Sequence, residues 1–242
     1  MGASAGSGNS IAQILNTNST NYGVANYTIT PTANNCVGNP IVVPINITPK
    51  PVIVATPNVQ TICSGDPITP IILTSNITGT TYNWTVTQTN VSGAIIGSGN
   101  SITQTLTNNS TIQGQASYTI NSILNNCPGN SSSALVNVNP TPLVNSNTIN
   151  QTICSNENTN ITLTSTVSNT LFSWTVTQTN VTGALSGSGN NINQTLINNT
   201  TITGLATYNV TPIATGCSGL PLLISVCLLY TSPSPRDRQK SR

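Results

Sequence analysis

Side chains that could act as acids, bases, nucleophiles or metal ligands are scarce in this 242-residue chain. Histidine is absent, which excludes a Ser-His-Asp triad and an imidazole-ligated metal. Outside the last seven residues the carboxylates are Asp66 and Glu157 alone. A glycosidase pair must flank one bond, whereas these two follow separate TICS segments 91 residues apart. We therefore predict that the chain is not an enzyme and has no catalytic residue, metal site or cofactor.

The glycine-rich segment GSGNSI, residues 97–102, looks like a loop that could cradle a phosphate. Such a loop needs a helix N-terminus behind it, but the residues that follow alternate between apolar and polar as in a strand. We therefore expect its glycines to serve a turn that requires a positive φ.

Two tryptophans, Trp84 and Trp174, and two tyrosines, Tyr118 and Tyr208, recur at matching places and could stack on a sugar ring. Aromatic residues make up only 4% of the chain, so few other large side chains can fill an interior. We therefore expect all four to anchor hydrophobic cores. On this reasoning Trp84→Ala lowers the free energy of unfolding by about 3–5 kcal/mol, and a near-neutral result in urea unfolding would contradict it.

The composition favours strands over helices. Thr, Asn and Ser account for 104 of the 242 residues, and these residues, like the β-branched aliphatics, are weak helix formers. Alternation with period two marks half-buried strands, as where Tyr82, Trp84 and Val86 share one face. About seven such strands in each 90 residues are typical of a β-sandwich. We expect an all-β fold with almost no helix, and no run reaches the roughly 18 apolar residues of a membrane span.

The chain consists of copies of one unit of about 90 residues. GASAGSGNSIAQILNTN, GAIIGSGNSITQTLTNN and GALSGSGNNINQTLINN begin at spacings of 91 and 90 residues. The segments 49–51 and 140–142, Pro-Lys-Pro and Pro-Thr-Pro, favour stiff, extended joints. We place a truncated C-terminal part of a repeat at 1–49, a complete repeat at 50–141 and a nearly complete one at 142–226, arranged like beads on a string. The chain is expected to be a fragment, and whether neighbouring repeats touch is left open.

Five cysteines before residue 227 keep this register. Each larger copy has one in a TICS segment, Cys63 or Cys154, and one in a late turn, Cys127 or Cys217, while Cys36 is left over. Two per copy fits disulfides within a repeat, Cys63 with Cys127 and Cys154 with Cys217, formed in an oxidising compartment. In an immunoglobulin-like strand order, however, the two turns lie at opposite ends, too far apart for Cα atoms that must approach to about 6 Å. Free buried thiols are the alternative.

The last sixteen residues differ in composition from the rest. Arg236, Arg238, Lys240 and Arg242 are four of the five basic residues, so the net charge of +2 comes from this tail. The run CLLYTSPSPRD, residues 227–237, resembles a translated sequencing-library adapter. We therefore expect residues 227–242 to be an unfolded tail that is foreign to the protein. Because the basic charge lies in this tail, we do not take it as a sign of a nucleic-acid partner.

Four segments in order, ATPNVQTICSGDPITPIILTSN, TTYNWTVTQTNVSGAIIGSGNSITQTLTNN, ASYTINSILNNCPGN and VNVNPTP, resemble the PKD-like, immunoglobulin-like repeats of large secreted surface proteins of Bacteroidetes. Many of those proteins are exported by the type IX system and linked to gliding or adhesion. The resemblance covers residues 1–226 and implies an extracellular tandem β-sandwich without catalytic residues. WTVTQ stands where many PKD domains have an acidic WDFGDG-like strand, so the calcium-dependent roles of those relatives are not implied.

The expected function is a non-catalytic stalk, spacer or adhesive region of a large bacterial cell-surface or secreted protein. Its expected partners are other repeats of the same chain and a surface polysaccharide or another cell-surface protein, without membrane insertion. The alternative is a carbohydrate-binding accessory module of a secreted hydrolase, which a polysaccharide pull-down dependent on Trp or Tyr would distinguish. A threonine-rich ice-binding array would need short solenoid repeats, which the 90-residue period disfavours.

Overall fold

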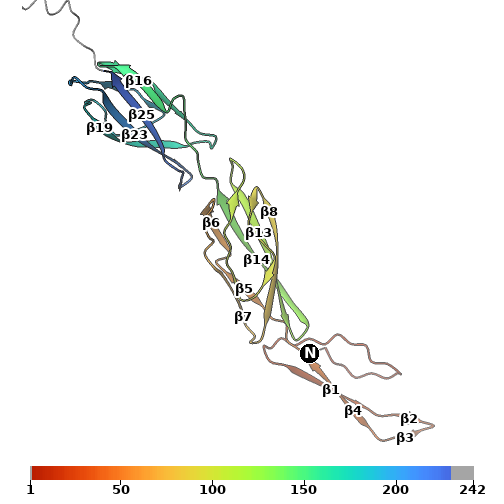
Figure 1. The fold of residues 1–242 in the computed structure, drawn as a ribbon. Helices are drawn as coiled ribbons and strands as arrows, with labels where there is room; N and C mark the ends of the chain where they lie inside the picture. Colours follow the sequence, from red (N-terminus) through yellow and green to blue (C-terminus); the bar gives the residue numbers. More distant parts are fainter. Residues whose placement is uncertain (1, 230–242) are drawn as a thin grey trace, which may run out of the picture.

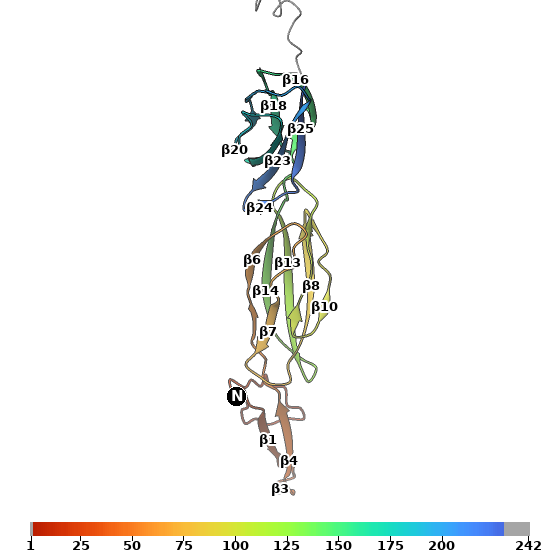
Figure 2. The same ribbon diagram turned by 60° about the vertical axis from the view of Figure 1, so that its left-hand side comes forward.

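A computed structural model describes residues 2–229 and shows three units placed end to end (Figures 1 and 2). All regular structure in this range is β, and no helix occurs in it. The chain passes through the units in order, from a small first unit through a second to a third. The fold is therefore a tandem array of β-sandwiches, as the alternation of apolar and polar residues predicts.

The second unit is a sandwich of two main sheets. The larger sheet has the order β10-β8-β13-β14-β6, built from β10 (Gly97–Ser98), β8 (Thr81–Thr89), β13 (Gly114–Leu124), β14 (Cys127–Asn139) and β6 (Val59–Cys63). The smaller sheet has the order β11-β7-β5, built from β11 (Ser101–Ile102), β7 (Ile71–Ser75) and β5 (Ile53–Thr56). A short pair, β9 (Val91–Ser92) with β12 (Thr107–Asn108), closes one side.

One pairing in the larger sheet decides where the cysteines lie. Strand β6 runs parallel to the end of β14, with Val59 opposite Leu135 and Cys63 opposite Asn139. All other pairings in this unit are antiparallel. Because β6 and β14 run in the same direction, both end at the pole that faces the third unit.

The third unit repeats this arrangement. Its larger sheet has the order β16-β25-β23-β19-β20, with β24 (Cys217–Ser218) also paired to β23, and the strands are β16 (Asn150–Cys154), β25 (Leu222–Leu229), β23 (Gly204–Ala214), β19 (Leu171–Thr179) and β20 (Gly187–Ser188). The smaller sheet is β15 (Asn145–Ser146), β18 (Ile161–Thr164) and β21 (Asn191–Ile192), and β17 (Glu157–Asn158) pairs with β22 (Thr195–Leu196). Strands β16 and β25 are again parallel, with Cys154 opposite Leu229.

Each sandwich encloses its own hydrophobic core. The period-two alternation places every second side chain of the long strands inside, as in β13, where Ala116, Tyr118 and Ile120 are fully buried. Strands β7 and β11 close the core from the other sheet with Ile71 and Ile102. The third unit has the same kind of cluster around Trp174 and Tyr208. Each of these two units therefore has the closed core that an independent domain needs.

The first unit is a two-stranded hairpin of β1 (Gly23–Ile29) and β4 (Ile41–Ile47), extended at its tip by β2 (Thr32–Ala33) and β3 (Cys36–Val37). It corresponds to β13 and β14, but the strands that cover that pair in the second unit, β5 and β7, have no counterpart among residues 2–49. Most of its large apolar side chains are consequently exposed, and Ile11, Tyr27 and Val43 line a hollow on the surface of this unit.

The expected boundary at residue 227 differs from the structure. Strand β25 continues through Cys227 and Leu228 to Leu229, and Leu228 is completely buried in the third core. Residues 227–229 are therefore not an unfolded tail, because their alternation of side chains suits the last strand whatever their origin. The remaining tail, residues 230–242, lies outside the described residues.

Candidate functional site

The four predicted core anchors lie inside the two sandwiches. Trp84 and Trp174 are each 6% exposed, and Tyr118 and Tyr208 are completely buried. Burial raises the pKa of both tyrosines to about 12, because desolvation disfavours the phenolate. Buried rings cannot offer a stacking platform to a sugar. Tyr22, at 56% exposed, is the one exposed aromatic side chain among residues 2–229.

A glutamine that the sequence reasoning missed connects these aromatic residues. Tyr118 donates its hydroxyl hydrogen to Gln104 Oε1 at 2.6 Å. The Gln104 amide donates to the Ile95 carbonyl at 2.9 Å and accepts from the Ile95 N–H at 3.2 Å. Trp84 Nε1 donates to the same carbonyl at 3.1 Å. Gln104 therefore satisfies the buried hydroxyl and pins the loop that covers the tryptophan.

This glutamine network occurs in all three units. Tyr208 bonds Gln194 at 2.8 Å, and Tyr27 bonds Gln13 at 2.7 Å even in the open first unit. The signal was present in the sequence, since Gln13, Gln104 and Gln194 stand at one place in SIAQIL, SITQTL and NINQTL. Alternation alone hides it, because a polar residue in a strand is expected to face water.

The two glycines of GSGN have different roles. Gly99 has a φ of 129°, as expected for a turn that requires glycine. Gly97 has no positive φ. It lies opposite Trp84 across the β8–β10 pair, where an added Cβ would come within 2.6 Å of Trp84 Cζ2. The expectation that a turn explains both glycines is therefore wrong for Gly97, which leaves room for the indole ring.

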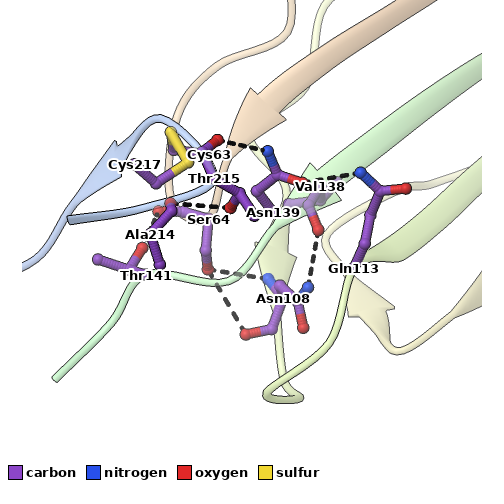
Figure 3. The surroundings of a disulfide bond; sticks show 10 residues. All are labelled: Cys63, Ser64, Asn108, Gln113, Val138, Asn139, Thr141, Ala214, Thr215 and Cys217. Atoms are coloured by element: carbon purple, nitrogen blue, oxygen red, sulfur yellow. Dashed lines mark hydrogen bonds between the residues drawn. A yellow bond between two sulfur atoms is a disulfide. The ribbon is translucent and has the colours of Figure 1, made fainter. Parts of the chain in front are cut away.

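The joint between the second and third units is the most specific arrangement on the described surface. Cys63, at the end of β6, is bonded to Cys217, the first residue of β24, directly after the turn that follows β23 (Figure 3). Their Cα atoms are 5.6 Å apart, although 154 residues separate them in the sequence. Cys217 is 1% exposed. Two covalent connections therefore join these units, the disulfide and the backbone at 140–142.

The predicted cysteine pairing within each repeat is wrong. Because Cys63 lies opposite Asn139, the last residue of β14, and Cys127 is the first residue of that strand, the whole strand separates them. At about 3.3 Å per residue this is about 40 Å, far beyond the roughly 7 Å that a disulfide allows. Cys154 and Cys217 are separated in the same way along residues 217–229. Cys36, Cys127, Cys154 and Cys227 are free.

Hydrogen bonds across the joint surround the disulfide. Asn139 Nδ2 donates to the Thr215 carbonyl at 3.0 Å, and Gln113 Nε2 donates to Asn139 Oδ1 at 2.8 Å (Figure 3). Thr141 in the linker donates to the Ser64 carbonyl at 3.3 Å. The turn that carries Cys217 is thus held by its backbone as well as by its sulfur.

A glycine, Gly219, allows the linker to lie close against the third unit. Gly219 donates its N–H to the Pro212 carbonyl at 2.9 Å, and an added Cβ would clash with the carbonyl of Pro142. Gly129 has the same relation to Pro51 at the joint between the first and second units. In the second and third units, the glycine of the Cys-x-Gly sequence therefore lets the linker proline that precedes the unit, Pro51 or Pro142, pass close by. At that first joint the Asn130 N–H donates to the Pro51 carbonyl at 3.1 Å, and the side-chain amide of Asn125 donates to the Tyr22 hydroxyl at 2.8 Å.

In the part of the chain that the structure describes, the acidic side chains do not lie together at one place. Asp66 and Glu157 are exposed in different units, and Glu157 accepts a hydrogen bond from the Cys154 N–H at 2.8 Å. Within residues 2–229 no three His, Cys, Asp or Glu side chains form a cluster that could hold a metal. That part of the chain also contains no helix with the length and apolar character to cross a membrane.

A known domain family matches the sequence at the period of the repeat. The PKD-like domain family matches residues 1–51, 60–142 and 151–231, one match for each unit. The chain belongs to the PKD-like domain family. The disulfide joint is thus a contact between two consecutive PKD-like domains. No curated protein matches the chain.

Three solved structures have distant similarity to this PKD-like array. Human mucin-like protocadherin EC1-2 is 10% identical, with 76% of this chain and 99% of that chain covered and a TM-score of 0.36. The titin I67–I69 variant is 8% identical, with 89% and 90% covered and a TM-score of 0.40. The protocadherin gamma B2 cadherin domains 1–5 are 12% identical, with 81% of this chain covered and a TM-score of 0.32, and the chain spans only 44% of their length.

Proposed function

We propose that this PKD-like chain is a non-catalytic structural repeat region, a stalk or spacer, of a large bacterial cell-surface or secreted protein. The observation that carries the proposal is the joint at Cys63 and Cys217, where two consecutive domains are fixed end to end by a disulfide and by hydrogen bonds from the side chains of Asn139 and Thr141 to backbone carbonyls. A joint with two covalent connections resists bending and rotation, which a spacer needs and a tethered binding module does not.

The surface and the cysteine chemistry support an extracellular setting. Disulfides of this kind form and persist in oxidising compartments. Lys50, Asp66 and Glu157 are the charged side chains of residues 1–229, so the polar part of the surface consists almost entirely of hydroxyl, amide and backbone groups. We place the parent protein among the secreted surface proteins of Bacteroidetes, exported by the type IX system and acting in gliding or adhesion. Its partners would be further repeats and, at the ends, a surface polysaccharide or another cell-surface protein.

The location can be tested on intact cells of the source organism. Antibodies raised against residues 52–140 should label unpermeabilised cells, and added protease should remove the label. Label that appears only after permeabilisation would overturn the proposal. An antibody against a cytoplasmic protein provides the control for cell integrity.

A polysaccharide pull-down tests the accessory-module alternative. The purified chain is expected to show no retention on insoluble polysaccharides, because the rings of Trp84, Trp174, Tyr118 and Tyr208 are buried. Tyr22→Ala, which removes the exposed aromatic ring, serves as the matched variant. Retention by the unaltered chain that is lost in Tyr22→Ala would replace the stalk with a carbohydrate-binding module.

A further inference from the structure

The far pole of the third unit repeats the bonded pole of the second unit, but no segment of residues 2–229 is bonded to its cysteine. Cys154 ends β16 as Cys63 ends β6, and each lies opposite the last residue of the final strand. Cys63 is bonded to the turn of the following unit. Cys154 is exposed and free.

Two of the hydrogen bonds that shape the bonded pole are also formed next to Cys154. Asn198 N–H donates to Ser155 Oγ at 2.9 Å, as Asn108 N–H donates to Ser64 Oγ at 2.9 Å. The Asn198 amide donates to the Ile202 carbonyl at 2.8 Å, and the Asn108 amide makes the equivalent bond to Ile112 at 2.8 Å. The Cys154 pole therefore already resembles the Cys63 pole, to which the turn at Cys217 is bonded in the same structure.

A turn that resembles the one at Cys217 lies at the opposite end of the described structure, directly before Cys36. The turn before Cys36 has φ values of 49° at Asn34 and 60° at Asn35, and the turn before Cys217 has 50° at Thr215 and 81° at Gly216. Each cysteine is followed by x-Gly, and the glycine N–H donates to a proline carbonyl at 2.8 Å in the first unit and 2.9 Å in the third. Cys36 is exposed and free, at the tip remote from the third unit (Figure 1).

We propose that the Cys154 pole of one molecule binds the Cys36 turn of a second copy of this chain, head to tail, and that the two cysteines form a disulfide. The joint continues the series begun at Cys63 and Cys217, with the same strand end and the same turn. The Cys154 pole and the Cys36 turn are different surfaces at opposite ends of the described structure, so the contact is heterologous. Repetition of this contact would produce linear assemblies. The inference rests on the Cys63–Cys217 joint and not on the stalk function.

The bond requires a disulfide oxidant such as oxidised glutathione. The Cys154 thiolate attacks one sulfur of oxidised glutathione. This step forms a mixed disulfide between Cys154 and one glutathione and releases the other glutathione as a thiolate. The Cys36 thiolate then displaces the second glutathione thiolate. Two cysteine thiols are oxidised and one glutathione disulfide is reduced to two thiols, so electrons and protons balance.

One difference at the Cys154 pole predicts a way to strengthen the joint. Leu229 stands at the place of Asn139, whose side-chain amide donates to the Thr215 carbonyl in the bonded joint. A turn docked at Cys154 therefore lacks that hydrogen bond. Leu229→Asn should restore it and raise the yield of the cross-link.

The test is oxidation of the full chain in a glutathione buffer, followed by non-reducing electrophoresis and peptide mass mapping. We expect a ladder of oligomers with Cys36–Cys154 peptides, and loss of the ladder in Cys36→Ser and in Cys154→Ser. Cys127→Ser and Cys227→Ser are the matched controls and should keep the ladder. Mixing the Cys36→Ser and Cys154→Ser chains should restore a dimer and nothing larger, because each supplies one half of the joint.

Three results would overturn the proposal. These are the absence of oligomers from the unaltered chain, cross-links spread without preference over the four free cysteines, and dominance of Cys36–Cys36 or Cys154–Cys154 bonds. Because Cys36 and Cys154 are exposed, serine at either place should leave the fold intact, and circular dichroism of each variant checks this.

Discussion

Mechanical extension gives the sharpest test of the Cys63–Cys217 bond. When the chain is pulled from its two ends, tension enters the second unit along residues 53–63, crosses the disulfide and leaves along residues 217–229. This route has about 22 residue steps and reaches about 75 Å when fully stretched. Two end-to-end sandwiches with strands of up to 13 residues have about the same length. The 154-residue separation between the cysteines is therefore shielded from tension.

Removal of the bond should expose that hidden length. Cys217→Ser adds the 154 residues to the stretched path, which at about 3.3–3.6 Å per residue is about 510–550 Å of extra contour length. Single-molecule force spectroscopy measures this directly, and Cys36→Ser, which alters the equivalent free cysteine of the first unit, should extend no further than the unaltered chain. If the oxidised chain reaches the same length as Cys217→Ser, the bond does not span the two domains and the argument fails.

Three further predictions concern the interior of the second unit. Gly97→Ala should destabilise it by about 1–3 kcal/mol because the new methyl group meets the Trp84 ring, whereas Gly6→Ala, at the equivalent place in the first unit with nothing within 4 Å, should be neutral in urea unfolding. Gln104→Leu should cost about 1–3 kcal/mol by leaving the Tyr118 hydroxyl unpaired, and Tyr118→Phe in the same chain should recover part of the loss; additive effects would argue against the hydrogen bond. Stability should fall as the pH rises from 10 to 12, because the unfolded Tyr118 phenol loses its proton near pH 10 and the buried one, with its pKa raised to about 12, keeps it; equal urea midpoints at pH 9 and pH 11.5 would contradict this.

Much of the fold could be predicted from local patterns. Alternation identified the faces of the long strands, so the burial of Tyr82 and Trp84 on one face follows from sequence period alone. The repeat register placed equivalent strands in each copy. These features are visible because they depend on neighbours a few residues apart or on repetition at a constant interval.

The cysteine partners could not be obtained in this way. Register shows which cysteines are equivalent, but pairing depends on β6 lying parallel to β14 and ending at its far pole, a contact between segments more than 70 residues apart. Expecting partners inside one repeat assumed that a domain closes on itself. Gly97 was misread for a related reason, since its constraint comes from Trp84 across the sheet and not from its own backbone.

The loop closed by Cys63 and Cys217 also changes what a protease can do to this protein. A single backbone cut anywhere between the two cysteines, including one in the linker at 140–142, leaves both ends of the chain covalently attached. Separation would need reduction of a bond whose Cys217 side is almost completely buried. The fragments of a molecule cut in this loop would therefore stay linked in an environment rich in proteases. The cut would become visible as separate fragments only after a reducing agent is added.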